Sequence, residues 1–245
     1  MSIIAVVGSK KSGKTTAIET LVRGLAKRGY RIATVKHIPE VDFTIDTEGK
    51  DTWRHAKAGA SNMISVAPNE IATIKKVDTT QYGLSEILRN VEEDMDIIIL
   101  EGFRRLVEQS YAIPKIVAAK TTNEILEASK RFKPILSFVG PIPTEAAKLN
   151  IQYIDVLMDP DRLVGLVDKN LAASVEKRRK RRGDIRIRID GQLLPLKTFV
   201  QKFVRNTILA MVSTLRDTKI KGDEDLFVTI RSASRHQQDA GNAEE

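Results

Sequence analysis

The sequence predicts an α/β protein built on a mainly parallel sheet, followed by a small α+β module. Apolar, β-branched segments alternate with segments of helical periodicity as far as about residue 171, an order typical of a doubly wound sheet. After a strongly basic stretch, the pattern changes to short strands of alternating polarity around one amphipathic helix. We therefore expect a nucleotide-binding domain at 1–171, a basic linker at 172–183, a β-β-α-β module at 184–232 and a disordered tail at 233–245.

The first strand, loop and helix carry the clearest motif. An apolar strand at 3–7 leads into Gly8–Thr15, which has the spacing G-x-x-x-x-G-K-[ST] of a phosphate-binding P-loop, and a helix at 16–27 follows. Backbone N–H groups and the positive helix N-terminus would hold a nucleotide's phosphates there. A flexible glycine turn before a surface helix is the alternative, and the complete signature between a strand and a helix argues against it. The residues we predict to bind the nucleotide are Gly8, Lys11, Ser12, Gly13, Lys14, Thr15 and Thr16.

The second strand, at 31–36, completes a β-α-β unit and should deliver its carboxyl end to the same face. A charged loop and a short helix at 50–57 follow it. We expect this region to face the γ-phosphate or an anionic second substrate, although such a loop is often only solvated. The candidates are Lys36, His37, Lys50, Asp51, Arg54 and His55.

A buried strand at 95–100 supplies the candidate metal ligand. Glu101 follows it directly, where Mg²⁺ bound to a nucleotide needs a carboxylate. Asp96 lies at the other end of the strand, roughly 15 Å away at about 3.3 Å per residue, and cannot share the site. We expect Thr15, Glu101 and Asp46 to serve Mg²⁺; the alternative for Glu101 is that it only caps a turn with Gly102.

The remaining elements fill in the sheet and the module. A hairpin around Pro68-Asn69 could extend the sheet's edge or build a dimer contact. In the module, Asp190-Gly191 predicts a tight hairpin turn. The other expected strands are 63–66, 71–75, 115–119, 135–139, 152–154, 185–189, 192–194 and 226–230, and the other expected helices are 83–93, 124–130, 144–148, 161–171 and one from 195.

The composition is that of an ordinary globular chain with excess positive charge. Its 245 residues are 42% hydrophobic and 29% charged, with a formal net charge of +8. The absence of cysteine excludes disulfides, iron–sulfur clusters and cysteine nucleophiles, and the three histidines are too scattered for a transition-metal site. No apolar run reaches the roughly 20 residues of a membrane span, and no signal peptide is apparent, so we expect a cytoplasmic protein.

Five separated motifs in order resemble the molybdopterin-guanine dinucleotide biosynthesis protein B (MobB) family over roughly residues 1–160. They are Gly8 to Thr16; Lys36-His37; the segment from Asp42 through Asp46, Gly49 to His55 and Ala58 to Ala60; Glu101 to Arg104; and Ile113 to Ile116. The resemblance implies a three-layer P-loop fold, a weak GTPase that binds GTP with Mg²⁺, and a homodimer. It also implies a supporting role beside the guanylyltransferase MobA, which joins GMP to molybdopterin.

The sequence departs from familiar patterns in two respects. No N-K-x-D motif for guanine follows a late strand, so base selectivity must rest on residues near 138–143. The family pattern does not require the C-terminal module, and no general base can be assigned. The resemblance does not decide between molybdenum and tungsten as the metal of the final cofactor.

Two other functional classes are compatible with parts of the sequence. A small-molecule kinase could use the same P-loop, with Arg54 and Arg104 holding a phosphate acceptor, although no arginine-bearing lid is evident. A nucleic-acid-binding protein could use the basic run at 177–182. Few aromatic residues accompany that run, which makes a nucleic-acid partner the weakest of the three readings.

Overall fold

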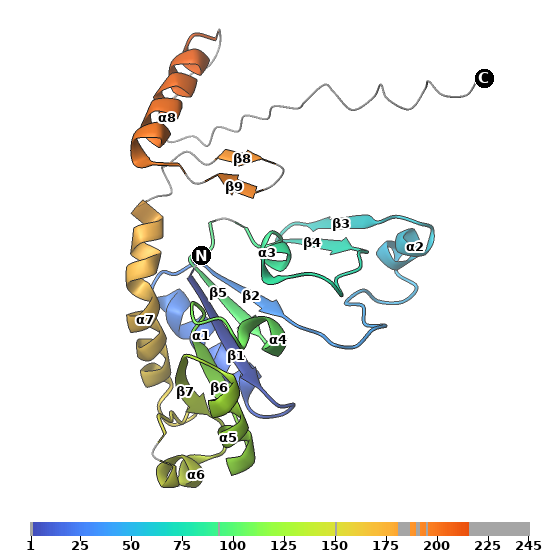
Figure 1. Cartoon of the computed structure of the whole chain (residues 1–245). Coiled ribbons are helices and arrows are strands. Elements are labelled where there is room, and N and C mark those ends of the chain that lie inside the picture. The colour runs from blue at the N-terminus through green and yellow to red at the C-terminus, as the bar shows by residue number, and fades with distance from the viewer. Residues whose placement is uncertain are drawn as a thin grey trace, which may run out of the picture. The chain divides into compact units, whose positions relative to one another are not determined.

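A computed structural model of the whole chain describes residues 2–92, 94–149, 151–180, 187–189, 192–194 and 196–215. The chain divides into two units, at residues 1–182 and 183–245. Figure 1 shows the elements of both units, coloured in chain order.

A five-stranded parallel sheet forms the centre of the first unit, in the order β2-β5-β1-β6-β7. The chain runs from the central strand to one edge, returns through β5 and then crosses to β6, so the direction of winding reverses beside β1. Ligands of open α/β sheets bind outside the carboxyl ends of the strands at such a point. The strands are β1 (Ser2–Gly8), β2 (Ile32–Lys36), β5 (Ile97–Glu101), β6 (Lys115–Ala118) and β7 (Ile135–Val139).

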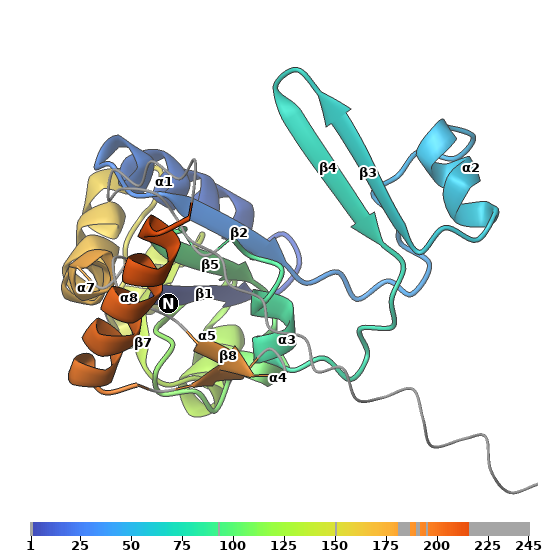
Figure 2. The same cartoon turned by 90° about the horizontal axis from the view of Figure 1, so that it is seen from above.

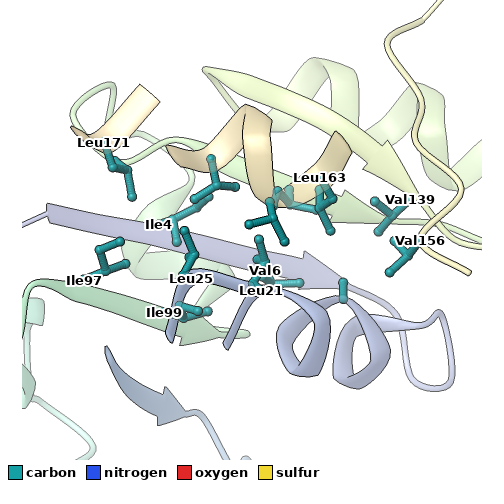
Figure 3. Close-up of a cluster of buried hydrophobic side chains, with 14 of the residues drawn as sticks. Ile4, Val6, Leu21, Leu25, Ile97, Ile99, Val139, Val156, Leu163 and Leu171 are labelled. Atoms are coloured by element: carbon teal, nitrogen blue, oxygen red, sulfur yellow. The ribbon is translucent and has the colours of Figure 1, made fainter. Parts of the chain in front are cut away.

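Helices cover both faces of this sheet, which confirms the three-layer α/β fold. One face packs against α1 (Lys14–Lys27) and α7 (Pro160–Lys180), and Figure 3 shows Leu21, Leu163 and Leu171 of these helices around Ile4 and Val6. Residues on the other face of the same strands, such as Ala5, Val7 and Leu100, pack under α5 and its neighbours. The helices on that side are α3 (Leu84–Leu88), α4 (Arg104–Val107), α5 (Thr122–Arg131) and α6 (Pro143–Lys148).

Two expected elements are shorter than the sequence indicated. The helix expected at 83–93 ends at Leu88, because the Asn90 side chain donates to the carbonyls of Glu86 and Ile87 and terminates it. The strand expected at 152–154 is only an isolated bridge between Phe138 and Tyr153.

Helix α7 extends well beyond the expected 161–171. Leu163, Val167, Leu171 and Val175 are all buried, so the apolar stripe continues at intervals of four residues. The described part of the segment expected to be a basic linker, residues 172–180, is therefore helical.

A separate two-stranded sheet of antiparallel β3 (Asn62–Ala67) and β4 (Glu70–Lys75) confirms the expected hairpin. It does not extend the edge of the main sheet. Helix α2 (Asp51–Lys57) lies beside β3, as Figures 1 and 2 show. Ile64, Val66 and Ile71 of the hairpin are largely exposed.

The second unit contains a short antiparallel hairpin and one helix. Strands β8 (Ile187–Ile189) and β9 (Gln192–Leu194) pair, and α8 (Thr198–Ser213) follows, three residues later than expected. The expected turn at Asp190-Gly191, the third strand at 226–230 and the tail at 233–245 lie outside the described residues. Within the described helices of both units, none is long and apolar enough to cross a membrane.

Candidate nucleotide-binding site

The P-loop joins β1 to α1 through backbone conformations that favour glycine. A Cβ on Gly8 would lie 2.2 Å from the Ala118 carbonyl oxygen, so no side chain fits there. Gly13 has φ 95° and directly precedes α1, and Lys11 has φ 60°. Helix α1 begins at Lys14, two residues earlier than expected, so its free N–H groups lie within the motif.

The lysine of the motif lies against the loop itself. Lys14 Nζ donates to the carbonyl oxygens of Ser9 at 2.5 Å and Gly8 at 3.2 Å. Ser12 is 1% exposed, and its hydroxyl donates to Ser9 O at 2.9 Å, which tightens the loop from inside. Burial lowers the pKa of Lys14, and the nearby Glu101 carboxylate partly offsets this effect.

Glu101 stands beside this lysine at the carboxyl end of β5. It is in register with Val6 of β1 on one side and Lys36 of β2 on the other. Lys36 Nζ lies 3.8 Å from Glu101 Oε2. The Gly102 N–H donates to the Val6 carbonyl, which continues the pairing of β5 with β1 beyond Glu101.

The charge around Lys14 is predominantly positive. Its pKa responds to the positive side chains of Arg104, Lys36 and Lys120 and to one carboxylate, that of Glu101. A cluster of this sign suits a polyanion such as a nucleoside triphosphate, particularly one that brings its own divalent cation.

Oxygen donors suited to Mg²⁺ are present at the same edge. The hydroxyl of Thr15, an exposed residue, is in the first turn of α1, and the Glu101 carboxylate is only 18% exposed. Among the described residues no group of three or more His, Cys, Asp or Glu could enclose a metal by itself. A Mg²⁺ ion bound to a nucleotide typically takes only one or two ligands from the protein, and phosphate and water supply the others. Thr15 and Glu101 therefore fit this ion.

His37 also reaches this edge. Its backbone N–H donates to the Glu101 carbonyl at 3.0 Å, and its ring centroid lies 5.2 Å from that of Phe103. Phe103 has φ 52° and Gly102 has φ 85°, so the chain turns sharply after β5 and holds the aromatic ring next to His37.

The segment from Asp46 to His55 makes its side-chain hydrogen bonds and its ion pair within its own loop and α2. Asp46 Oδ1 accepts from the Thr47 N–H and the Thr52 hydroxyl, so this carboxylate supports the start of α2. Asp51 and Arg54 form an exposed ion pair on the same helix. No hydrogen bond or ion pair between described residues joins Asp46, Lys50, Asp51, Arg54 or His55 to the P-loop, and their role toward phosphate or metal stays a prediction.

Two residues next to the loop were not among the predicted site residues, although Gly140 lies in the 138–143 region expected to govern base selectivity. Lys120 follows β6, and its Nζ donates to the Lys10 carbonyl at 3.1 Å. Gly140, which follows β7, has φ 109°, and a Cβ there would lie 2.3 Å from Ala119 O and 2.9 Å from Ser12 O. Their position directly after parallel strands is the signal that could have found them.

Residues 3–139, more than half of the chain, match the family model described as "MobB: Molybdopterin guanine dinucleotide synthesis protein B". The chain belongs to the MobB family. This confirms the resemblance seen in the motifs. A relative from Methanocaldococcus jannaschii, named a putative molybdopterin-guanine dinucleotide biosynthesis adapter protein, is 30% identical over 88% of this chain and 92% of its own length.

Bacterial relatives named molybdopterin-guanine dinucleotide biosynthesis adapter proteins match a smaller share of the chain. The Haemophilus influenzae protein is 26% identical over 68% of this chain and 85% of its own length. The Escherichia coli protein is 28% identical over 64% of this chain and 89% of its own length. The M. jannaschii match at 88% leaves fewer residues unmatched than the second unit contains, so it reaches into residues 183–245.

Solved MobB structures share the fold. A crystal structure of molybdopterin-guanine biosynthesis protein B aligns with a TM-score of 0.52 at 24% identity, covering 69% of this chain and 99% of that protein. Bacillus subtilis MobB aligns with a TM-score of 0.50 at 24% identity, covering 68% and 98%. About two thirds of this chain aligns with almost the whole length of each of these two solved proteins.

Proposed function

We propose that this MobB protein binds GTP with Mg²⁺ at the P-loop and acts as a cytoplasmic accessory protein in molybdenum or tungsten cofactor synthesis. In this role it assists the attachment of GMP to molybdopterin, as a weak GTPase rather than a fast one. The observation that carries the proposal is the Lys14 ammonium held inside the loop beside Glu101, in a chain whose relatives are named as adapters of molybdopterin-guanine dinucleotide synthesis.

The partners that follow from this role are molybdopterin and a MobA-type guanylyltransferase. A homodimer is part of the proposal, and the β3–β4 hairpin supports it. Ile64, Val66 and Ile71 are 59%, 76% and 70% exposed, and Val66 lies directly opposite Ile71 in the ladder. Apolar residues gathered on so small a sheet favour burial against a second copy.

Calorimetric titration of non-hydrolysable GTP and ATP analogues in the presence of Mg²⁺ tests nucleotide binding. We expect GTP to bind at least tenfold more tightly than ATP, about 1.4 kcal/mol, and Lys14→Ala to abolish binding. Lys27→Ala, at the far exposed end of α1, is the matched control and should leave affinity unchanged. Equal or tighter ATP binding would favour a kinase, and binding of neither nucleotide would contradict the proposed role of the loop.

Analytical ultracentrifugation tests the dimer. The wild type should sediment as a dimer, and Val66→Asp should sediment as a monomer that still binds the GTP analogue. A monomeric wild type, or a dimer that persists in Val66→Asp, would show that this hairpin does not form the interface.

A further inference from the structure

A pocket opens beside the P-loop between β6, α4 and α5. Gly8 belongs to its lining, together with Ala118 at the end of β6 and Ala128 on α5. These side chains are small or absent, and they leave a hollow next to the first turn of the loop. Phe132, at the end of α5, supplies an apolar wall.

The charged groups of the pocket are of both signs. Arg104 lines the pocket and makes no ion pair among the described residues. Its positive charge contributes to the lowered pKa of Lys14. Arg131, in contrast, is paired with Glu108 and lies over the Phe132 ring at 5.5 Å. The guanidinium of Arg104 is therefore the group in this pocket that can bind an anion.

A carboxylate is available at the same rim. Glu124 Oε2 accepts the Lys120 backbone N–H at 2.7 Å, which commits that oxygen. Glu127 lies one helical turn further along α5, is exposed, and forms no ion pair within the described part of the chain. A carboxylate accepts two adjacent N–H groups side by side, as the amino and ring N–H groups of a 2-amino-4-oxopyrimidine present them.

We propose that this pocket binds a second ligand, a fused 2-amino-4-oxopyrimidine ring that carries an anionic arm. The anion lies on Arg104, the N–H edge of the ring faces Glu127, and the apolar wall at Phe132 borders the ring. Pterins and guanine nucleotides share this chemistry. The inference rests on the proposed function, because it assigns the P-loop to GTP and this pocket to a second ring of this type, from a pterin or a guanine nucleotide.

Titration of the full chain with two probes, pterin-6-carboxylate and GMP, tests the pocket while a non-hydrolysable GTP analogue saturates the P-loop. Pterin fluorescence reports the first probe and calorimetry the second. We expect at least one probe to bind stoichiometrically, which also identifies the source of the ring. Arg104→Gln and the pocket-filling Ala128→Leu should each weaken that binding at least tenfold, whereas Lys130→Gln, on α5 outside the pocket lining, should not change it.

Two further measurements separate this inference from the proposed function. Lys14→Ala should lose the GTP analogue but keep the probe, and Ala128→Leu should keep its circular dichroism spectrum and its affinity for the analogue. If the wild type binds no GTP analogue, the proposed function fails, and titration without the analogue still tests the pocket. The pocket inference is overturned if neither probe binds, if both pocket variants bind as tightly as the wild type, or if the analogue displaces the probe.

Discussion

Replacing Arg179 by methionine should destabilise the first unit through a carboxylate far away in the sequence. The Asp96 side chain is 2% exposed and receives Arg179 Nε at 3.1 Å and Nη2 at 2.7 Å. The same guanidinium donates to the Gly29 carbonyl at 2.8 Å. In the variant the Arg31 N–H still donates to Asp96 Oδ2, at 2.9 Å.

The expected cost follows from this geometry. Removing one partner of a fully buried ion pair costs about 3–5 kcal/mol. The Arg179 side chain is 44% exposed, so water partly screens the pair and can partly replace it. We therefore expect a loss of about 2–3 kcal/mol in the free energy of unfolding, which lowers the Tm by about 4–12 °C for a unit of this size.

Urea unfolding followed by circular dichroism measures this loss, with Lys177→Met as the control because Lys177 belongs to the same basic run and is exposed. A double-mutant cycle with Asp96→Leu isolates the coupling between the two side chains. If Arg179→Met costs no more than Lys177→Met, the ion pair adds no stability of its own and does not hold α7 in place.

Three further changes have defined outcomes. Gly140→Ala should cost at least about 2 kcal/mol of stability and weaken nucleotide binding, because the new Cβ meets the Ala119 carbonyl at 2.3 Å from a left-handed φ; thermal unfolding and calorimetry measure the two effects. Glu101→Gln should reduce the affinity for Mg²⁺ in the nucleotide complex by about 10–100-fold, which a Mg²⁺ titration of the bound GTP analogue measures. Tyr30 donates to Asp168, and this hydrogen bond raises the pKa of Tyr30, so its stabilising contribution should be present below about pH 10 and be lost as the pH rises through the raised folded value. Between pH 9 and pH 11 the free energy of unfolding of Tyr30→Phe should therefore fall less than that of the wild type. Urea titrations near pH 9 and pH 11 measure this difference.

Each of these predictions has a contrary result. Wild-type stability in Gly140→Ala would show that the loop after β7 moves away at little cost. An unchanged Mg²⁺ requirement in Glu101→Gln would remove this carboxylate from the metal site. Parallel pH curves for Tyr30→Phe and the wild type would mean that the hydroxyl does not lose its bond to Asp168 in this range.

The sequence predicts the central elements well because their signals are local. The Ile97 to Leu100 run is apolar at every position, as a strand buried on both faces requires, and these residues are fully buried. The P-loop spacing places Lys14, and the rule that parallel strands end at the ligand face places Lys36 and Glu101.

The features missed by the sequence prediction depend on contacts between distant segments. The basic composition of 176–182 concealed the apolar stripe that continues through Val175, and the partner of Arg179 lies 83 residues earlier. Whether the Asp46 to His55 segment reaches the phosphates depends on the path of an irregular loop, which local spacing does not specify, and that role stays a prediction. The close approach of Gly140 to Ser12 and Ala119 appears only once β7 is packed beside β6.

Helix α7 also determines where a shortened chain can end. A chain cut at residue 171, where the composition turns basic, would lose Val175 from the core and leave the Asp96 carboxylate without its guanidinium. A chain that retains residues through Arg182 keeps both. The C-terminal boundary of the first unit thus depends on a contact to Asp96, the residue just before β5, which the local charge of the segment does not reveal.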